Sequence, residues 1–335
     1  MPRITKRIYD FEESINDFMI YCTNKDLTKK TMKSYESTLK LFAKYLSDEA
    51  NVFTPLEVTS KQIKEYLEFT RSKGKYSYVV DSDSLKYNNP SARGDFGKQV
   101  SMYTVNNYLR NIKVYFTWLY DNKVIKSNPV VQIKAYKHSR KPKKEIKDVD
   151  FNKVLKCLDL TSYAEYRDYV ILQLLLDTGM RIGETLNLRT EDILIDKKAI
   201  FIPSEITKGR KDRYVFFSTI MQNILKKWID YKERYFDSEY VFTSSRGSNF
   251  NIINFEKNLK KYCMRANLAE SITCHQIRNN FSKRFLLSGG DIFILSKILG
   301  HSDVRVTQEA YLDVTDEDIR KSYVKFSPLE NMRKN

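Results

Sequence analysis

Apolar side chains recur every three to four residues along much of the first part of the chain, which predicts four helices there. The first covers residues 11–22, and the others begin after Thr28, at Thr59 or Ser60, and near Thr104. Hydroxyl side chains at the last three starts are good N-caps. The stripes are explained most simply as core, with Lys and Arg on the opposite faces, so we expect a small bundle of about four helices.

The second part of the chain changes pattern. A strongly apolar helix at 168–180 and a short one at 182–189 precede three short apolar runs at 193–195, 199–202 and 213–217, which are typical of strands. Helical spacing then returns in six segments: 219–232, 251–266, 275–288, 291–299, 303–312 and 316–323. The sequence therefore predicts a mostly α fold with a small antiparallel β-sheet.

Two segments interrupt these patterns. Residues 72–100 have no helical period and are rich in Ser, Gly, Asn and Asp, so they predict a long loop inserted in the bundle. Residues 137–147 are rich in Lys and Arg and contain Pro142, which is typical of a linker, either solvated or lying along phosphates. We expect a helical domain at 1–136, an interdomain linker at 137–149 and an α+β domain at 150–335.

Composition narrows the class of protein. With 41% hydrophobic and 30% charged residues in 335, the chain has enough apolar material for folded domains. No apolar run is long enough to cross a membrane, so no membrane partner is expected. Four scattered Cys without a CxxC pair indicate neither a disulfide framework nor a zinc ribbon. A reducing cytoplasm is the simplest location.

The net positive charge of the chain indicates an anionic binding partner. The formal net charge is +16, and most of the excess lies in residues 1–147. A polyanion such as nucleic acid is the natural partner for this excess, although a basic charge that serves only solubility is the simpler alternative.

Three segments contain candidate reactive side chains: TGMRIGETLNL (178–188), TCHQIRNNFSKRFL (273–286) and ILGHSDVRVTQEAYL (298–312). His275 and Arg278 are three residues apart on one predicted helix and share a face. Each residue alone has an ordinary explanation. Arg181 has Glu184 one turn away, and Tyr311 is one of 23 tyrosines.

Together, such side chains suit attack on a phosphodiester. Tyr acts as a covalent nucleophile, and two Arg clamp the non-bridging oxygens with planar donors that stay charged. His residues add donors or move the phenol proton. A Lys on a flexible β-turn is well suited to protonate the leaving oxygen, and TKGRKDRY offers Lys208 and Lys211.

In this order, TGMRIGE, TKGRKDR, HQIR and LGHSDVRVTQEAY resemble the catalytic motifs of the tyrosine recombinases, the phage-integrase family of site-specific DNA recombinases. The resemblance covers residues 150–323 well. The helical N-terminal part is similar to the family's core-binding (SAM-like) domain through its helix pattern and the segment FTWLYDNKVIKSNPV. The departure from the family is the 72–100 insertion.

The resemblance implies a role for each matching residue. Arg181 and Arg278 would clamp the phosphate, Glu184 would support the site structurally, and Lys208 would be the general acid, in preference to Lys211. His275 fits the HxxR pair, His301 fits the position held by His or Trp, and Tyr311 would form a 3′-phosphotyrosyl bond. Tyr323 lies too far from the LGH motif to compete.

Cofactors and metals are not implied. No phosphate-binding GxxxxGK[ST] loop occurs, and a zinc site from Cys263, Cys274, His275 and His301 matches no common spacing. The resemblance implies double-stranded DNA with specific recombination sites as substrate, a homo-tetramer on DNA, and accessory DNA-bending or directionality proteins. The tail from Asp316 to Asn335 is a candidate for docking into a neighbouring subunit, and packing on its own domain is the alternative.

The sequence thus favours an integrase or transposase of a mobile element. Three alternatives remain: a non-catalytic DNA-binding regulator on the same scaffold, an Xer-type resolvase of chromosome dimers, and a type IB topoisomerase. The regulator would be expected to lack a catalytic residue, and every expected position is filled.

Overall fold

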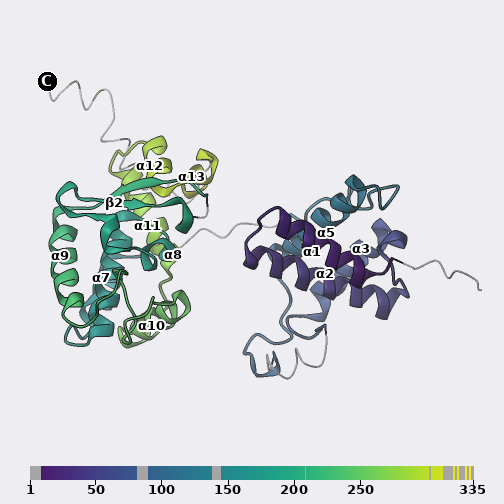
Figure 1. The fold of residues 1–335 in the computed structure, drawn as a ribbon, viewed down its shortest axis with the longest axis horizontal. Helices are drawn as coiled ribbons and strands as arrows, with labels where there is room; N and C mark the ends of the chain where they lie inside the picture. Colours follow the sequence, from purple (N-terminus) through teal and green to yellow (C-terminus); the bar gives the residue numbers. More distant parts are fainter. Residues whose placement is uncertain are drawn as a thin grey trace, which may run out of the picture. The chain divides into compact units, whose positions relative to one another are not determined.

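The chain folds into two compact units, Met1–Arg140 and Lys141–Asn335. The computed structural model describes residues 9–80, 90–137, 145–207, 209–301 and 303–311, and the single positions 320, 323, 329 and 332. Most of the expected linker, residues 138–144, lies outside the described residues. Figure 1 shows the two units.

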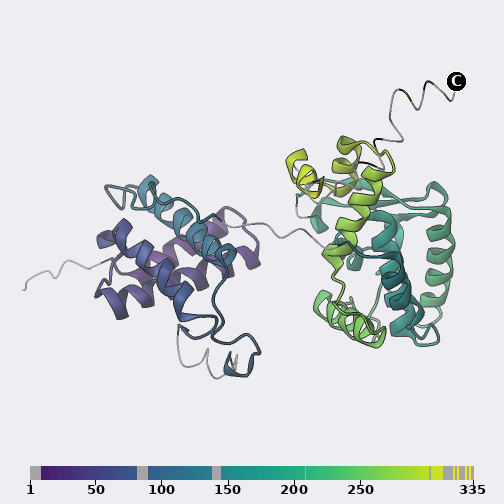
Figure 2. The same ribbon diagram turned by 180° about the vertical axis from the view of Figure 1, so that it is seen from behind.

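The N-terminal unit is a bundle of four long helices: α1 (Phe11–Asn24), α2 (Lys29–Ala50), α3 (Ser60–Lys73) and α5 (Met102–Asp121) (Figure 2). Short 3₁₀ turns lie at Pro55–Glu57 and Pro90–Ala92. Thr28 and Thr59 cap α2 and α3, as predicted, and Thr59 forms a capping box with Gln62. The last helix begins slightly earlier than predicted, because Ser101 accepts a hydrogen bond from the Thr104 N–H.

The inserted segment is closed where it leaves the bundle. The Lys75 N–H donates to the Lys98 carbonyl, and the Gly97 N–H donates to the Lys75 carbonyl, both at 2.9 Å. Gly74 has φ +91°, and a Cβ there would lie 2.4 Å from the Gly97 carbonyl oxygen, so only glycine fits. Tyr78 then packs edge-on against Phe69 of α3. Main-chain pairing and this ring contact hold the base of the insertion against the helices.

The C-terminal unit contains eight α-helices among its described residues, of which five precede or flank the sheet. These are α6 (Asp148–Lys156), α7 (Tyr163–Thr178), α8 (Ile182–Leu186), α9 (Thr219–Glu233) and α10 (Ile252–Arg265). The others are α11 (Cys274–Leu287), α12 (Ile292–Leu299) and α13 (Val304–Tyr311), and short 3₁₀ turns accompany the strands. Helix α6 was not predicted, and α7 begins earlier than predicted. The predicted helix at 316–323 lies outside the described residues except for single positions.

A three-stranded antiparallel sheet lies between α8 and α9 in the sequence, with strand order β1-β2-β3. Its strands are β1 (Ile193–Leu194), β2 (Ala199–Ile202) and β3 (Arg213–Phe216). Ile200 pairs with both Ile193 and Val215, which puts apolar side chains of all three strands on the inner face. The predicted class, mostly α with a small antiparallel sheet, is confirmed.

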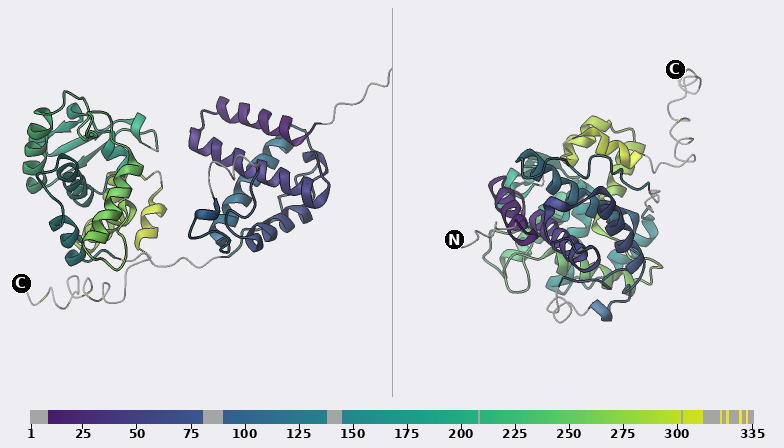
Figure 3. Two further views of the ribbon diagram at one scale, coloured as in Figure 1. Left: turned by 90° about the horizontal axis from the view of Figure 1, so that it is seen from below. Right: turned by 90° about the vertical axis from the view of Figure 1, so that its right-hand side faces the viewer.

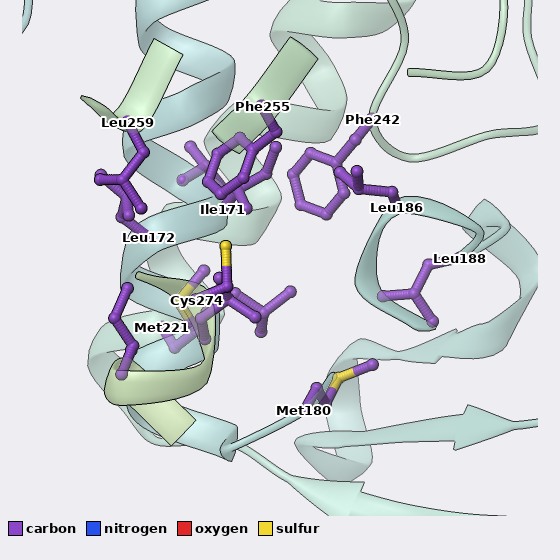
Figure 4. Close-up of a cluster of buried hydrophobic side chains, with 14 of the residues drawn as sticks. Ile171, Leu172, Met180, Leu186, Leu188, Met221, Phe242, Phe255, Leu259 and Cys274 are labelled. Carbon is purple, nitrogen blue, oxygen red and sulfur yellow. The ribbon is translucent and has the colours of Figure 1, made fainter. Parts of the chain in front are cut away.

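Helix α7 is the centre of the C-terminal unit. It packs against α9 and α11 (Figure 3). Its Val170, Ile171 and Leu174 are fully buried. Figure 4 shows Met180 and Cys274 within this core. Each is followed directly by a candidate site residue, Arg181 and His275, so the core fixes the backbone on which those side chains stand.

Among the described residues, no helix is both long and apolar enough to cross a bilayer. The same residues contain no group of three or more His, Cys, Asp or Glu placed to hold a metal ion. The four cysteines are free thiols.

Candidate functional site

Three arginines from three different elements meet at the carboxyl end of α12. Arg181 is the N-cap of α8, Arg213 begins β3, and Arg278 lies on α11. We call these three residues the arginine cluster. Gly300, with φ +64°, ends α12 in the left-handed conformation, and His301 follows it.

The last carbonyls of α12 hold the arginine cluster in place. Ile298 accepts from Arg213 Nε at 2.9 Å, and Leu299 accepts from Arg278 Nη2 at 2.7 Å and from Arg181 Nη1 at 3.3 Å. Gly300 accepts from Arg181 Nη2 at 3.5 Å. The final carbonyls of a helix lack partners within it and carry its negative dipole end. They therefore attract three guanidinium groups that would otherwise repel one another.

Glu184 is the carboxylate of this site. Its Oε1 accepts from Arg181 Nη1 at 2.9 Å, and its Oε2 accepts from Arg213 Nη2 at 2.6 Å and from the Arg181 N–H at 3.0 Å. Burial opposes ionisation of this side chain, but the hydrogen bonds and charge of Arg213 and Arg181 leave the pKa of Glu184 below its ordinary value. The local alternative, an Arg181–Glu184 pair, is thus present, and Glu184 also binds Arg213.

Arg278 is buried and pairs with no carboxylate among the residues that the structure describes. Its acceptors are the carbonyls of Gly179 and Leu299, both at 2.7 Å, and the imidazole of His301, at 3.1 Å. Burial, followed by repulsion from Arg181 and Arg213, lowers the pKa of Arg278 to about 9. A buried cation of this kind is stabilised by any anion that reaches it.

The hydrogen bonds of His301 fix its tautomer. A guanidinium only donates, so Nε2 accepts from Arg278, and Nδ1 carries the proton and donates to Thr307 Oγ1 at 2.8 Å. Burial and then the charges of the arginine cluster lower the pKa of His301 to about 4. The imidazole is therefore neutral at physiological pH, and it links Arg278 to α13.

The remaining predicted residues are only partly located. His275 is exposed in the first turn of α11, and Arg278, three residues further along the same helix, is buried. Lys208 lies outside the described residues, and Lys211 is exposed. Tyr311 ends α13, which packs against α11 and α12, and its side chain lies outside the described part.

Arg213 is the site residue that sequence reasoning missed. A usable signal existed, because Arg213, Val215 and Phe217 alternate along β3 and beyond it, and the last two are buried. A charged residue at an inward-facing position of a strand needs a partner. Its partner, Glu184, lies far away in the sequence, and no local pattern reveals it.

The arrangement suits an oxyanion. Three guanidinium groups face one buried carboxylate, which leaves an excess of positive charge at the end of α12. Arginine donors match the planar, paired oxygens of a phosphate, and the neutral His301 adds no competing charge. The geometry therefore fits recognition of a phosphate group with its charge spread over several oxygens.

Comparisons with known proteins agree with this chemistry. The model of the phage integrase family matches residues 147–318. The tyrosine recombinase XerC of Oceanobacillus iheyensis is 26% identical over 327 residues, covering 96% of this chain and 97% of the relative. The tyrosine recombinase XerD of a Listeria monocytogenes strain is 24% identical and covers 94% of this chain and 98% of the relative.

Solved structures show the same fold. A Tn1549 transposon integrase in complex with a circular intermediate DNA has a TM-score of 0.70 at 15% identity and covers 95% of this chain and 99% of that one. The XerH site-specific recombinase bound to a palindromic difH substrate has a TM-score of 0.67 at 17% identity, covering 92% and 83%.

Proposed function

Because the chain belongs to the phage integrase family of tyrosine recombinases, which are DNA strand-transferring enzymes, we propose that it cuts and rejoins DNA at specific sites. The observation that carries this proposal is the buried Arg278, which contacts carbonyls and an imidazole and no described carboxylate. The scissile phosphate is the anion for this cation, and Arg181 binds a second non-bridging oxygen. The charge that develops on the phosphate during reaction is stabilised there.

Tyr311 is the nucleophile of the proposed reaction. It stands four residues after Thr307, so its position is one turn further along the same face of α13, and Thr307 is bonded to His301. The phenol oxygen forms a bond to phosphorus while the bond from phosphorus to the 5′ oxygen breaks. His275 takes the phenol proton, and Lys208 gives a proton to the leaving 5′ oxygen.

Strand exchange is the reverse step with another DNA end. A 5′-hydroxyl of the partner strand attacks the phosphotyrosine, and Tyr311 leaves and regains its proton. The number of phosphodiester bonds is unchanged, so no external energy source is needed. In this step His301 orients Arg278, and Glu184 holds Arg181, without either reacting.

Domain roles and assembly follow from the same proposal. Residues 1–136 bind the DNA core site, the linker at 137–149 follows the backbone, and residues 150–335 carry the chemistry. The net positive charge supports this division, because most of it lies in residues 1–147 and neutralising phosphates drives DNA binding. Two duplexes need four active sites, so we propose a homo-tetramer on DNA, with accessory DNA-bending or directionality proteins acting beside it.

The biological role has two candidates. One is integration or transposition of a mobile element, which the inserted segment favours. The other is resolution of chromosome dimers, which is favoured by curated relatives named XerC and XerD that align over almost the whole chain. Deletion of the gene separates them, because only loss of a dimer resolvase produces a population of filamentous, unsegregated cells.

Covalent capture tests the reaction itself. The probe is a pool of nicked duplexes with random sequence. When the protein cleaves a strand near its nick, the short fragment that is needed for religation leaves the duplex, and the covalent intermediate is trapped. Wild-type protein should form a denaturation-resistant adduct at Tyr311, and Tyr311→Phe should bind the enriched duplexes without forming it. An adduct at another residue, or none after enrichment, contradicts the proposal. A regulator would bind without any adduct, and a type IB topoisomerase would capture the pool without enriching a sequence.

A further inference from the structure

We propose that Arg213 is a positioning residue of the active site, which keeps Arg181 available to the scissile phosphate and holds the end of α12 in place. This inference rests on the proposed function and deepens it. Arg213 touches no reacting group, and it acts through Glu184 and through the Gly300 turn.

The first observation is the sharing of Glu184. Arg213 donates to both oxygens of this carboxylate, at 3.2 Å and 2.6 Å, whereas Arg181 reaches it with one side-chain nitrogen and its own backbone N–H. The Arg213 pair is the more buried of the two, since its side chain is 8% exposed and that of Arg181 is 29% exposed. Arg213 therefore supplies most of the compensation for the charge of Glu184.

The second observation is the fit of Arg213 beneath the turn at Gly300. Its Nε donates to the Ile298 carbonyl. A Cβ on Gly300 would lie only 2.9 Å from that Nε and 3.0 Å from the adjoining carbons, so the glycine lies flat against the guanidinium. Arg213 thus sets the position of the segment from which Leu299 and Gly300 present their carbonyls to Arg278 and Arg181.

Loss of Arg213 would change the ion pairing of Glu184. Without Arg213, the buried carboxylate of Glu184 has Arg181 as its one remaining ion-pair partner among the described residues. Arg181 then turns towards Glu184 with both terminal nitrogens, because a buried carboxylate attracts the nearest cation strongly. The phosphate loses one of its two clamping groups, although both guanidinium groups are still present.

A double-substitution experiment separates this role from a simple loss of folding. Arg213→Leu should slow adduct formation about 10- to 100-fold in single-turnover assays on the duplexes enriched by the wild type, with DNA affinity little changed. Adding Glu184→Gln removes the carboxylate that captures Arg181. The Glu184→Gln/Arg213→Leu protein should therefore react faster than Arg213→Leu alone. If the two substitutions damaged the site independently, the double variant would instead be the slower of the two.

Controls fix the interpretation. Arg213→Lys keeps the charge and loses the paired donors, and it should fall between wild type and Arg213→Leu. Tyr262→Phe removes a buried hydrogen bond to Asp168 elsewhere in the same unit, and it should lower thermal stability without changing the rate per folded molecule. Thermal unfolding of every variant gives the folded fraction.

The outcomes are distinct. If the double variant is slower than Arg213→Leu, or if Arg213→Leu reacts like the wild type, the role of Arg213 is overturned and the recombinase function stands. If the wild type forms no adduct on any member of the pool, the proposed function falls, and the role of Arg213 within it falls too. Faster reaction of the double variant, with equal folded fractions, supports the inference.

Discussion

Two arginines, Arg167 and Arg278, are buried among the described residues of the C-terminal unit, and their surroundings differ in one respect. Arg167 is 2% exposed and donates from Nε and Nη2 to Asp168, at 2.9 Å and 2.8 Å. Its Nη1 donates to the Thr243 carbonyl, and its guanidinium lies 3.3 Å from the ring centre of Phe250. Arg278 is 6% exposed and has carbonyls and an imidazole as its acceptors.

The difference separates a structural charge from one that awaits a ligand. Asp168 neutralises Arg167, and Tyr262 and Asn258 donate to the second oxygen of Asp168, so that network is complete within the fold. Arg278 is hydrogen-bonded and oriented but has no carboxylate bonded to it among the described residues, and burial and repulsion from Arg181 and Arg213 outweigh the attraction of Glu184 and lower its pKa. Burial alone therefore does not identify a functional arginine, whereas burial without a carboxylate does.

The largest expected effect concerns the buried ion pair of Arg167 and Asp168. Arg167→Leu leaves the carboxylate of Asp168 buried without its cation, and we expect a loss of about 3–5 kcal/mol in the free energy of unfolding of the C-terminal unit. Chemical denaturation followed by tryptophan fluorescence measures this loss, because Trp228 is buried in that unit. A loss below about 1 kcal/mol, the range of exposed ion pairs, would remove the contrast between the two arginines.

For Arg278 we expect the opposite, a large loss of activity with little loss of stability. Arg278→Ala should lower the rate of adduct formation about 10²- to 10³-fold, because it removes a preorganised donor for the developing charge. Its free energy of unfolding should change little or rise, since a buried cation without a carboxylate is costly to the folded state. Single-turnover capture and denaturation of the same sample measure both quantities. A large loss of stability together with full activity would contradict the comparison.

A pH effect comes next in size. His301 has a pKa of about 4 when folded, against 6.5 ordinarily. The unfolded chain therefore binds the proton first as the pH falls, so the contribution of this imidazole is complete above pH 6.5 and is lost towards pH 4. Discounted for partial exposure, the loss is about 1–2 kcal/mol.

His301→Gln isolates this contribution from that of the carboxylates. The difference in free energy of unfolding between wild type and His301→Gln should shift across the same pH interval, in favour of the wild type at higher pH. A constant difference from acid to neutral pH would show that His301 titrates alike in both states.

The smallest effect is expected for Tyr262, which donates a hydrogen bond to the Arg167–Asp168 pair. Tyr262→Phe removes one donor to Asp168 but leaves Arg167 in place, and it should cost about 1 kcal/mol. Denaturation again measures the loss, and adduct formation per folded molecule should stay at the wild-type rate. A reduced rate would mean that the two arginine networks are coupled.

Local sequence signals predicted most of the fold. Thr28 and Thr59 cap α2 and α3, at the starts that the hydroxyl side chains in the sequence predicted. Helix α6 was missed because it is short and offers little more than Phe151 and Val154 as an apolar face. The start of α5 was misplaced because Ser101 and Thr104 are both good caps, and only the structure shows which one is used.

The candidate site was predictable as a set of residues but not as a geometry. The motifs pointed to Arg181, Arg278 and His301, and the structure brings these three together. Arg213 depends on a carboxylate in a distant element, and such a pair is set by tertiary packing. The roles of Lys208, His275 and Tyr311 stay predictions that the capture experiments test.

The closed base of the inserted segment makes the helical bundle insensitive to what the insertion carries. Lys75, Gly97 and Lys98 join through main-chain hydrogen bonds, and Tyr78 anchors the outgoing segment on Phe69. Lengthening, shortening or tagging the sequence beyond this junction therefore leaves the bundle's register untouched. The junction is a natural place to graft a fluorophore or an affinity handle, and a point at which related chains can diversify without refolding.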